Sequence, residues 1–182
     1  MLLALLFACS RPEPPDHFGH VPAFSLIDQA GKAATLADWS DRAWVADFMF
    51  TSCPDVCPVL SARMAALAGK YATNDRVRFV SISVDPVGDT PEKLAAYAAR
   101  FGADASRWRF LTGENGAIKT LVVDGFKQLL QDAPATATEP ATVLHGSRFV
   151  LVDGKGEIRG FPDPNTPGEV EAQLDVLLAV GW

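Results

Sequence analysis

The sequence has no excess of basic residues and few cysteines. Its 182 residues include 16 Lys and Arg against 22 Asp and Glu, which gives a formal net charge of −6. A nucleic-acid-binding surface is usually basic, so we expect no nucleic-acid partner. The three cysteines, at positions 9, 53 and 57, are too few for a disulfide-stapled scaffold. The hydrophobic core must therefore hold the fold, which leaves the cysteines available for chemistry.

An apolar run long enough to cross a membrane as a helix, about 20 residues, is also missing from the N-terminus. Residues 1–9 read MLLALLFAC, a short apolar stretch in which Ala8 precedes Cys9. This resembles the end of a bacterial lipoprotein signal with a lipid on Cys9, although no Lys or Arg precedes the apolar run. We therefore expect a lipid-anchored protein on the periplasmic face of the bacterial cytoplasmic membrane, or a secreted periplasmic one.

The segment after Cys9 is rich in proline and polar groups and shows no apolar period. It reads SRPEPPDHFGHVP over residues 10–22. Such a segment cannot bury enough surface to order itself, and proline-rich chain is extended and semi-rigid. We predict a tether over 10–22 between an anchor segment at 1–9 and one folded domain at 23–182. His17 and His20 fall in this tether, where we expect them to be solvated.

Strand patterns alternate with helix patterns in the predicted domain. The expected elements are a hairpin within 23–46, a buried strand at 44–50, a helix to about residue 72, a strand at 76–85, a helix from Pro91, a strand at 108–112, a short helix at 114–124, a loop at 132–142, strands at 147–153 and 157–161, and a closing helix with a capping box at 166–169. This alternation implies βαβ units on a partly parallel sheet. The expected fold is α/β and thioredoxin-like, with a central mixed sheet flanked by helices and an N-terminal hairpin extension.

The motif TSCPDVCP at residues 51–58 directly follows the predicted buried strand. Cys53 and Cys57 are four residues apart, so a helical turn places both side chains on one face. Their sulfurs should then lie outside the carboxyl edge of the sheet, where open α/β folds bind ligands. Because the start of a helix favours anions and lowers thiol pKa values, we expect thiolates that bind a metal or attack a disulfide.

Two soft thiolates favour Cu(I), zinc or an iron–sulfur cluster. A structural zinc site needs four protein ligands, and the predicted domain supplies only one histidine, His145. Two sulfurs and one imidazole suit copper, which tolerates low coordination. His145 lies just before the strand predicted at 147–153, in a loop that should come near the start of the Cys-bearing helix. We therefore predict one copper ion, as Cu(I), Cu(II) or both, on Cys53, Cys57 and His145.

Three segments together resemble the Sco/SenC family of copper-binding proteins, over about residues 20–180. They are DFMFTSCPDVCP at 47–58, SISVDPVGDTPEKLAAYAARFG at 81–102 and HGSRFVLVDGKGEIRGF at 145–161. The resemblance implies a thioredoxin fold and a copper chaperone, rather than an enzyme, that helps to mature the copper centre of cytochrome c oxidase. The implied partners are the copper-bearing subunit of that oxidase or another copper chaperone, and the membrane through the lipid anchor.

The resemblance also extends to single residues. Cys53, Cys57 and His145 match the positions of the family's copper ligands. Asp85, in the sequence VDP, matches an acidic residue that lies near the site in the family. We therefore expect Asp85 close to the metal, without assigning it a role.

The same pair of cysteines suits a thiol–disulfide reductase. Asp47 favours this alternative, because it lies six residues before Cys53, an offset similar to that of the buried acid in thioredoxin. A buried carboxylate there can accept a proton from the resolving thiol. Against a reductase, thioredoxins usually carry a cis-proline where this sequence has His145. A peroxide reductase of this fold needs a Thr three residues before its cysteine, and Thr51 is only two before Cys53.

Overall fold

The computed structural model describes residues 16–128, 130–133, 142–145 and 147–182. The strands of the main sheet are β1 (Ser25–Asp28), β2 (Ala33–Thr35), β3 (Ala43–Met49), β4 (Val77–Ser83), β5 (Trp108–Thr112), β8 (Val150–Val152) and β9 (Ile158–Gly160). The helices are α1 (Val56–Lys70), α2 (Pro91–Arg100), α3 (Asn115–Thr120) and α4 (Glu169–Val180), with the short helical turns η1 (Leu36–Trp39) and η2 (Leu121–Gly125). The predicted cysteine-bearing helix, the helix from Pro91 and the closing helix are all present.

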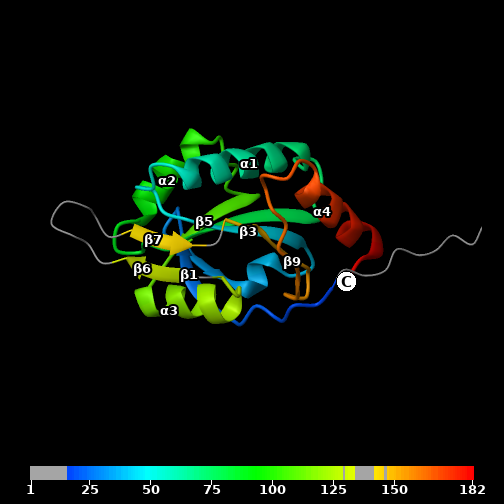
Figure 1. Ribbon diagram of the computed structural model, residues 1–182, viewed down its shortest axis with the longest axis horizontal. Coiled ribbons are helices and arrows are strands. Elements are labelled where there is room, and N and C mark those ends of the chain that lie inside the picture. Colours follow the sequence, from blue (N-terminus) through cyan, green and yellow to red (C-terminus); the bar gives the residue numbers. More distant parts are fainter. Residues whose placement is uncertain (1–15, 129, 134–141, 146) are drawn as a thin grey trace, which may run out of the picture.

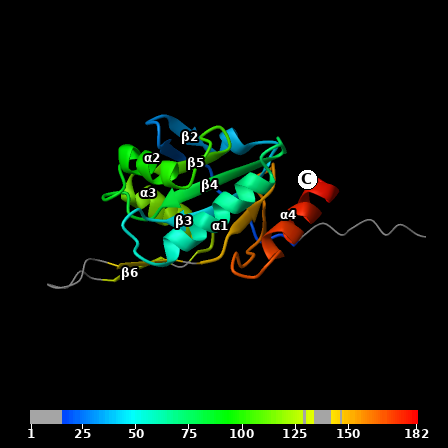
Figure 2. The same cartoon turned by 90° about the horizontal axis from the view of Figure 1, so that it is seen from above.

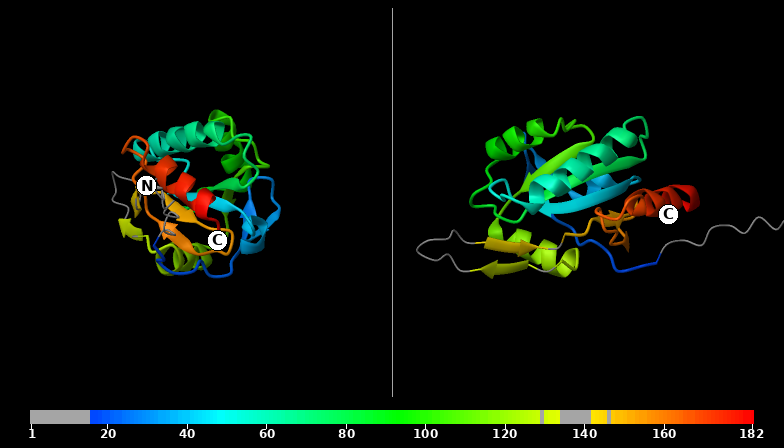
Figure 3. Two further views of the ribbon diagram at one scale, coloured as in Figure 1. Left: turned by 90° about the vertical axis from the view of Figure 1, so that its right-hand side faces the viewer. Right: turned by 45° about the horizontal axis from the view of Figure 1, so that its top comes forward.

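The seven main strands form one mixed sheet in the order β2-β1-β5-β4-β3-β8-β9. β3, β4 and β5 run parallel, whereas β1 and β8 are antiparallel to their neighbours in the sheet. Helices α1, α2 and α4 lie on one face, and α3 lies on the other (Figures 1 and 3). This is the predicted thioredoxin-like arrangement, and the β1–β2 hairpin is its predicted N-terminal extension.

Helices cover both faces of the sheet, so its inner strand β3 is fully buried. All seven residues of β3 are buried, which explains why its sequence AWVADFM lacks the alternation of a half-exposed strand. Large aromatic side chains fill the space around it; fully buried examples are Trp44, Phe48, Phe79, Trp108, Phe110 and Phe126. Phe48 packs edge to face on Phe126 with ring centroids 5.2 Å apart. Burial of each such ring contributes about 2–3 kcal/mol to stability.

Sequence patterns account for the helices that pack on this core. The buried residues Cys57, Leu60, Met64 and Leu67 recur along α1 at helical spacing and face the sheet. At the start of α2, Thr90 is the N-cap, and its side chain accepts a hydrogen bond from the Lys93 amide at 3.4 Å. Pro91 occupies the first helical position, where its missing N–H costs nothing.

The last residues of the predicted tether are ordered against the domain. The Phe18 amide donates to the Ile158 carbonyl at 3.0 Å, and the Val21 amide donates to the Gly156 carbonyl at 2.9 Å. Val21 is fully buried. β9 is an edge strand whose backbone groups need partners, and this segment supplies them. The prediction of an unordered tether up to residue 22 is therefore wrong for these residues, whereas residues 10–15 lie outside the described ranges.

A second, two-stranded sheet replaces part of a predicted loop. β6 (Leu130–Ala133) pairs antiparallel with β7 (Thr142–His145), and His145 lies opposite Leu130. The loop predicted over 132–142 is therefore too long at both ends, and its middle, 134–141, lies outside the described residues. The strand predicted at 147–153 is shorter, since β8 covers only Val150–Val152.

The closing helix begins later than predicted. α4 starts at Glu169, and its N-cap is Gly168 with a φ of 78°. This left-handed conformation interrupts the helix that Thr166 and Pro167 were expected to open. The Glu169 side chain accepts a hydrogen bond from the Asp163 amide at 3.1 Å instead of closing a capping box. The capping-box prediction is wrong because turn geometry at a glycine overrides a local motif.

One carboxyl group is buried within the core. Asp47 on β3 is only 1% exposed and lies opposite Ser81 of β4. The Ser81 hydroxyl donates to Asp47 Oδ1 at 2.5 Å and accepts from Trp108 Nε1 at 2.9 Å. Asp47 Oδ2 is buried and has no hydrogen-bond partner among the residues that the structure describes. Burial raises the pKa of Asp47 to about 7, against a smaller opposing effect of the Ser81 hydrogen bond.

We predict that Asp47→Asn removes a pH-dependent loss of stability. The folded carboxyl keeps its proton up to about pH 7, whereas in the unfolded chain it ionises near 3.8. Between these values the folded state holds more protons, so rising pH favours unfolding, by roughly 4 kcal/mol in all. In urea unfolding of the reduced, metal-free protein from pH 4 to 8, the free energy of unfolding of the variant should rise relative to that of the wild type up to pH 7.

The exposed Asp124 provides the matched control. Asp124→Asn should follow the wild-type pH profile, because its carboxyl is solvated in both states. Parallel profiles for wild type and Asp47→Asn would contradict the prediction.

Candidate metal centre

The chain between β3 and α1 brings the two cysteines together. After β3, the Cys53 amide donates to the Phe50 carbonyl at 3.2 Å and closes a turn. α1 then begins at Val56, and the Cys57 amide donates to Cys53 Sγ at 3.4 Å. Both residues are thiols rather than a disulfide. The predicted placement of the two side chains at the start of this helix is correct.

The Cys53 sulfur takes the place of a helix cap. Asp55 is the N-cap residue of α1, but its side chain makes no capping hydrogen bond. The amide of Cys57, one of the first-turn groups without a partner inside the helix, instead points at Cys53 Sγ. Amides at helix starts are the groups that bind anions, so this arrangement suits a sulfur that carries negative charge when it binds metal.

The two thiols differ in exposure. Cys53 is 9% exposed and Cys57 is fully buried. Burial raises the pKa of the Cys57 thiol far above its usual value, and its hydrogen bond with Cys53 and the charges of Cys53 and Asp47 add to the effect. The prediction that the helix start lowers the pKa of both thiols is therefore wrong for Cys57. A thiol so protected stays protonated at neutral pH until a metal or an oxidant reacts with it.

Asp85 shapes the loop that follows β4. Its Oδ1 accepts a hydrogen bond from the Gly88 amide at 3.0 Å, and its carbonyl accepts from the Asp89 amide at 2.9 Å. A Cβ at position 88 would lie 2.2 Å from Asp85 Oδ2, so any larger residue there requires the Asp85 side chain to move. Because β3 and β4 are parallel neighbours, this loop and the cysteine loop leave the same edge of the sheet.

Asp89 links these two loops directly. It is 1% exposed, and its carboxylate accepts hydrogen bonds from the backbone amide and hydroxyl of Thr51 and from the hydroxyl of Ser83. No sequence pattern singles out this residue, because an acid just before a helix N-cap is ordinary in loops. Only the pairing of β3 with β4 shows that it contacts the residue two positions before Cys53.

The third predicted ligand is placed only by its backbone. His145 is the last residue of β7, which lies at the same end of the molecule as the loop before α1 (Figures 1 and 2). The structure describes the backbone of His145 but not its side chain. Among the side chains that it describes, no three of His, Cys, Asp and Glu are grouped as a metal site. Cys53, Cys57 and His145 as one ligand set therefore stays a prediction.

The tether histidines are away from the cysteine loop. His17 pairs with Glu157 near β9, and His20 Nε2 hydrogen-bonds the Lys155 carbonyl at 3.0 Å. Both lie at the surface. The proposed lipid site Cys9 is outside the described residues. Among the helices that the structure does describe, none combines the length and apolar character needed to cross a bilayer.

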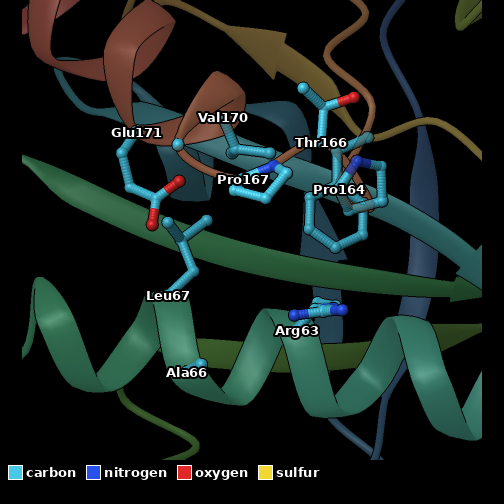
Figure 4. A pocket seen from close by; sticks show the side chains of 10 residues that line it. Arg63, Ala66, Leu67, Pro164, Thr166, Pro167, Val170 and Glu171 are labelled. Carbon is cyan, nitrogen blue, oxygen red and sulfur yellow. The ribbon is translucent and has the colours of Figure 1, made fainter.

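A cavity of about 290 Å³ lies elsewhere, between α1 and the chain that leads into α4. Figure 4 shows Arg63 and Leu67 of α1 facing Pro164, Pro167 and Val170 across it. Neither cysteine lines this cavity. The cysteine loop is therefore separate from this cavity.

Comparison with solved structures finds the same fold in proteins of one family. A SCO1/SenC family lipoprotein from Bacillus anthracis is 34% identical with a TM-score of 0.78, and the match covers 89% of this chain and 95% of that one. ScoI of Bradyrhizobium japonicum, solved with copper bound, is 27% identical with a TM-score of 0.72, over 88% of this chain and 99% of that one. BsSco, in which a disulfide switch was identified, is 32% identical with a TM-score of 0.74, over 92% and 96%.

BsSco is described as a member of the Sco family of cytochrome c oxidase assembly proteins. The family model described as SCO1/SenC matches residues 12–178, nearly the whole chain. That range includes the paired thiols at the start of α1, the loop that carries Asp85 and Asp89, and β7. The family resemblance inferred from the sequence motifs is thus confirmed, and this chain belongs to the SCO1/SenC family.

Proposed function

We propose that this protein binds one copper ion through Cys53, Cys57 and His145 and delivers it to the copper centre of cytochrome c oxidase. The observation that carries the proposal is the contact of the Cys57 amide with Cys53 Sγ at 3.4 Å, which places two sulfurs at one helix start. Copper bound to ScoI, a family member of the same fold, supports it. Paired thiolates with one imidazole are a ligand set that copper accepts.

Copper is the cargo of this site, and the two sulfurs differ in how a partner reaches them. Cys53 is buried but keeps 9% of its surface accessible, whereas Cys57 in the first turn of α1 is fully buried. A partner with competing thiols or imidazoles therefore meets Cys53 first and takes the metal by ligand exchange. Oxidation to a Cys53–Cys57 disulfide removes both thiolates, so only the reduced protein accepts copper.

The proposal includes a place and partners for the protein. A lipid on Cys9 and the tether that follows it hold the domain on the periplasmic face of the cytoplasmic membrane. The Bacillus anthracis relative is described as a lipoprotein, which supports an anchored domain. The partners are the copper-bearing subunit of cytochrome c oxidase or another copper chaperone, both within reach of a domain held at that membrane surface.

We predict that the reduced protein takes up one Cu(I) per chain in an anaerobic titration against a competing chelator. Cys53→Ser and Cys57→Ser each remove a soft ligand, and His145→Ala removes the imidazole. Each should weaken binding by at least about 100-fold, since even residues that only orient ligands change metal affinity 10–100-fold. His20→Ala removes a surface histidine of the tether and should bind copper like the wild type.

Equal affinity in the wild type and all three ligand variants would refute the copper proposal. Loss of binding in the two cysteine variants alone would remove His145 from the ligand set.

The buried Asp47 favours a second candidate, a thiol–disulfide reductase that acts before or without copper delivery. Its charge is one of the influences on Cys57, so the two groups are electrostatically coupled. In this reaction the Cys53 thiolate attacks a target disulfide and releases one target thiolate. Cys57 then attacks Cys53, which frees the second target thiolate and leaves a Cys53–Cys57 disulfide. Two thiols of this protein are oxidised for each target disulfide that is reduced.

We predict that the reductase activity, measured on a disulfide-bonded peptide with dithiothreitol as the electron source, depends on both cysteines. Cys57→Ser should trap the peptide as a mixed disulfide on Cys53, because no second thiol is left to release it. Asp47→Asn should slow turnover by about tenfold or more, since the variant cannot accept a proton. Turnover by Cys53→Ser equal to that of the wild type would exclude this activity.

A further inference from the structure

Asp89 is a carboxylate that the fold keeps out of water without a cationic hydrogen-bond partner among the described residues. It is 1% exposed, and the described residues that donate hydrogen bonds to it, Thr51 and Ser83, are uncharged. Burying an ionised carboxylate costs several kcal/mol unless hydrogen bonds offset the loss of hydration. A buried carboxylate is therefore expected where its hydrogen bonds hold segments of the chain in a specific geometry.

The hydrogen bonds of Asp89 hold the start of the cysteine loop. Thr51 donates twice, from its amide to Oδ2 at 3.0 Å and from its hydroxyl to Oδ1 at 2.5 Å. The Thr51 amide also lies 3.2 Å from Oδ1. The Ser83 hydroxyl, at the end of β4, donates to Oδ2 at 2.6 Å. Both carboxylate oxygens are therefore used, and they join two loops that are 38 residues apart in the sequence.

A short series of contacts connects Thr51 to the thiols. Thr51 lies two residues before Cys53, within the turn that the Cys53 amide closes on the Phe50 carbonyl at 3.2 Å. That turn sets the position of Cys53 Sγ, which accepts the Cys57 amide at 3.4 Å. Ser52 and Pro54 are exposed, whereas Thr51 is hydrogen-bonded to Asp89, so Thr51 is the residue that fixes this end of the loop.

We propose that Asp89 is a positioning residue for the metal and redox chemistry of Cys53. By holding Thr51, it sets the distance between the two sulfurs before any ligand arrives. A loop held in its binding geometry loses less conformational entropy when the metal binds, and second-layer contacts of this kind typically change metal affinity 10–100-fold. The effect on copper rests on the proposed function, whereas the effect on the thiol pair does not.

Two explanations of an Asp89 effect can be separated by substitution. Asp89→Asn removes a negative charge and one acceptor oxygen. It therefore weakens the hydrogen bonds to Thr51 and, at the same time, changes the electrostatic field at the cysteines. Thr51→Val keeps the charge and the side-chain shape but removes the hydroxyl donor. Asp55→Asn removes the charge of an exposed carboxylate between the two cysteines, whose side chain makes no capping hydrogen bond. If Asp89 acts by positioning, Asp89→Asn and Thr51→Val should both change the chemistry of Cys53. If it acts by its charge, Asp89→Asn and Asp55→Asn should do so.

The experiment measures two properties of the wild type, these three variants and the Thr51→Val/Asp89→Asn double variant. The first is the midpoint potential of the Cys53–Cys57 pair in glutathione buffers without copper. The second is Cu(I) affinity of the reduced protein against a competing chelator. We expect Asp89→Asn and Thr51→Val each to weaken copper binding by about tenfold and to shift the thiol–disulfide equilibrium constant by a similar factor. The double variant should match the stronger single one, because both remove the same interaction.

Asp55→Asn should stay within about twofold of the wild type in both measurements. Wild-type values for Thr51→Val, or a double variant whose losses add, would overturn the proposal. Circular dichroism and thermal unfolding identify any variant that fails to fold, and Thr51→Val then decides the test alone. If the wild type binds no copper, the proposed function fails, and the thiol–disulfide equilibrium still tests Asp89.

Discussion

The parallel pairing of β3 with β4 is the constraint on which the site depends. It sets Met49 beside Ser83 at the ends of two buried strands, so the loops that follow leave the sheet as neighbours. One loop carries Cys53 and opens the helix of Cys57; the other carries Asp85 and Asp89. The burial of β3 and the aromatic core around it make this register rigid, because a one-residue slip would turn every side chain to the opposite face.

On this frame, the two thiols occupy different environments although they are one helical turn apart. Cys53 retains 9% exposure, and its sulfur accepts a hydrogen bond from a backbone amide; Cys57, in the first turn of α1, is fully buried, and this burial raises its pKa. Such a pair offers one sulfur to partners and protects the other. This division suits both transfer of a metal and exchange of a disulfide.

Two buried carboxylates support the site in different ways. Asp47 lies inside the sheet, where one of its oxygens has no hydrogen-bond partner within the described part of the chain, and its raised pKa keeps it largely neutral below pH 7. Asp89 has both oxygens hydrogen-bonded by the loop residues that it joins. The first makes the core sensitive to pH, and the second holds the backbone before Cys53 in place. Each is a costly group in the interior, and each lies next to the strand end or loop that presents the thiols.

The sequence by itself determined what depends on neighbours along the chain. The spacing of Cys53 and Cys57, the helix that follows and the strand before them are local features, and the family motifs identified them. Tertiary structure alone decided the contact of Asp89 with Thr51, the pairing of residues 18–21 with β9 and the burial that reverses the expected pKa of Cys57. These depend on which distant segments meet and on what they exclude from water, which no local pattern of residues records.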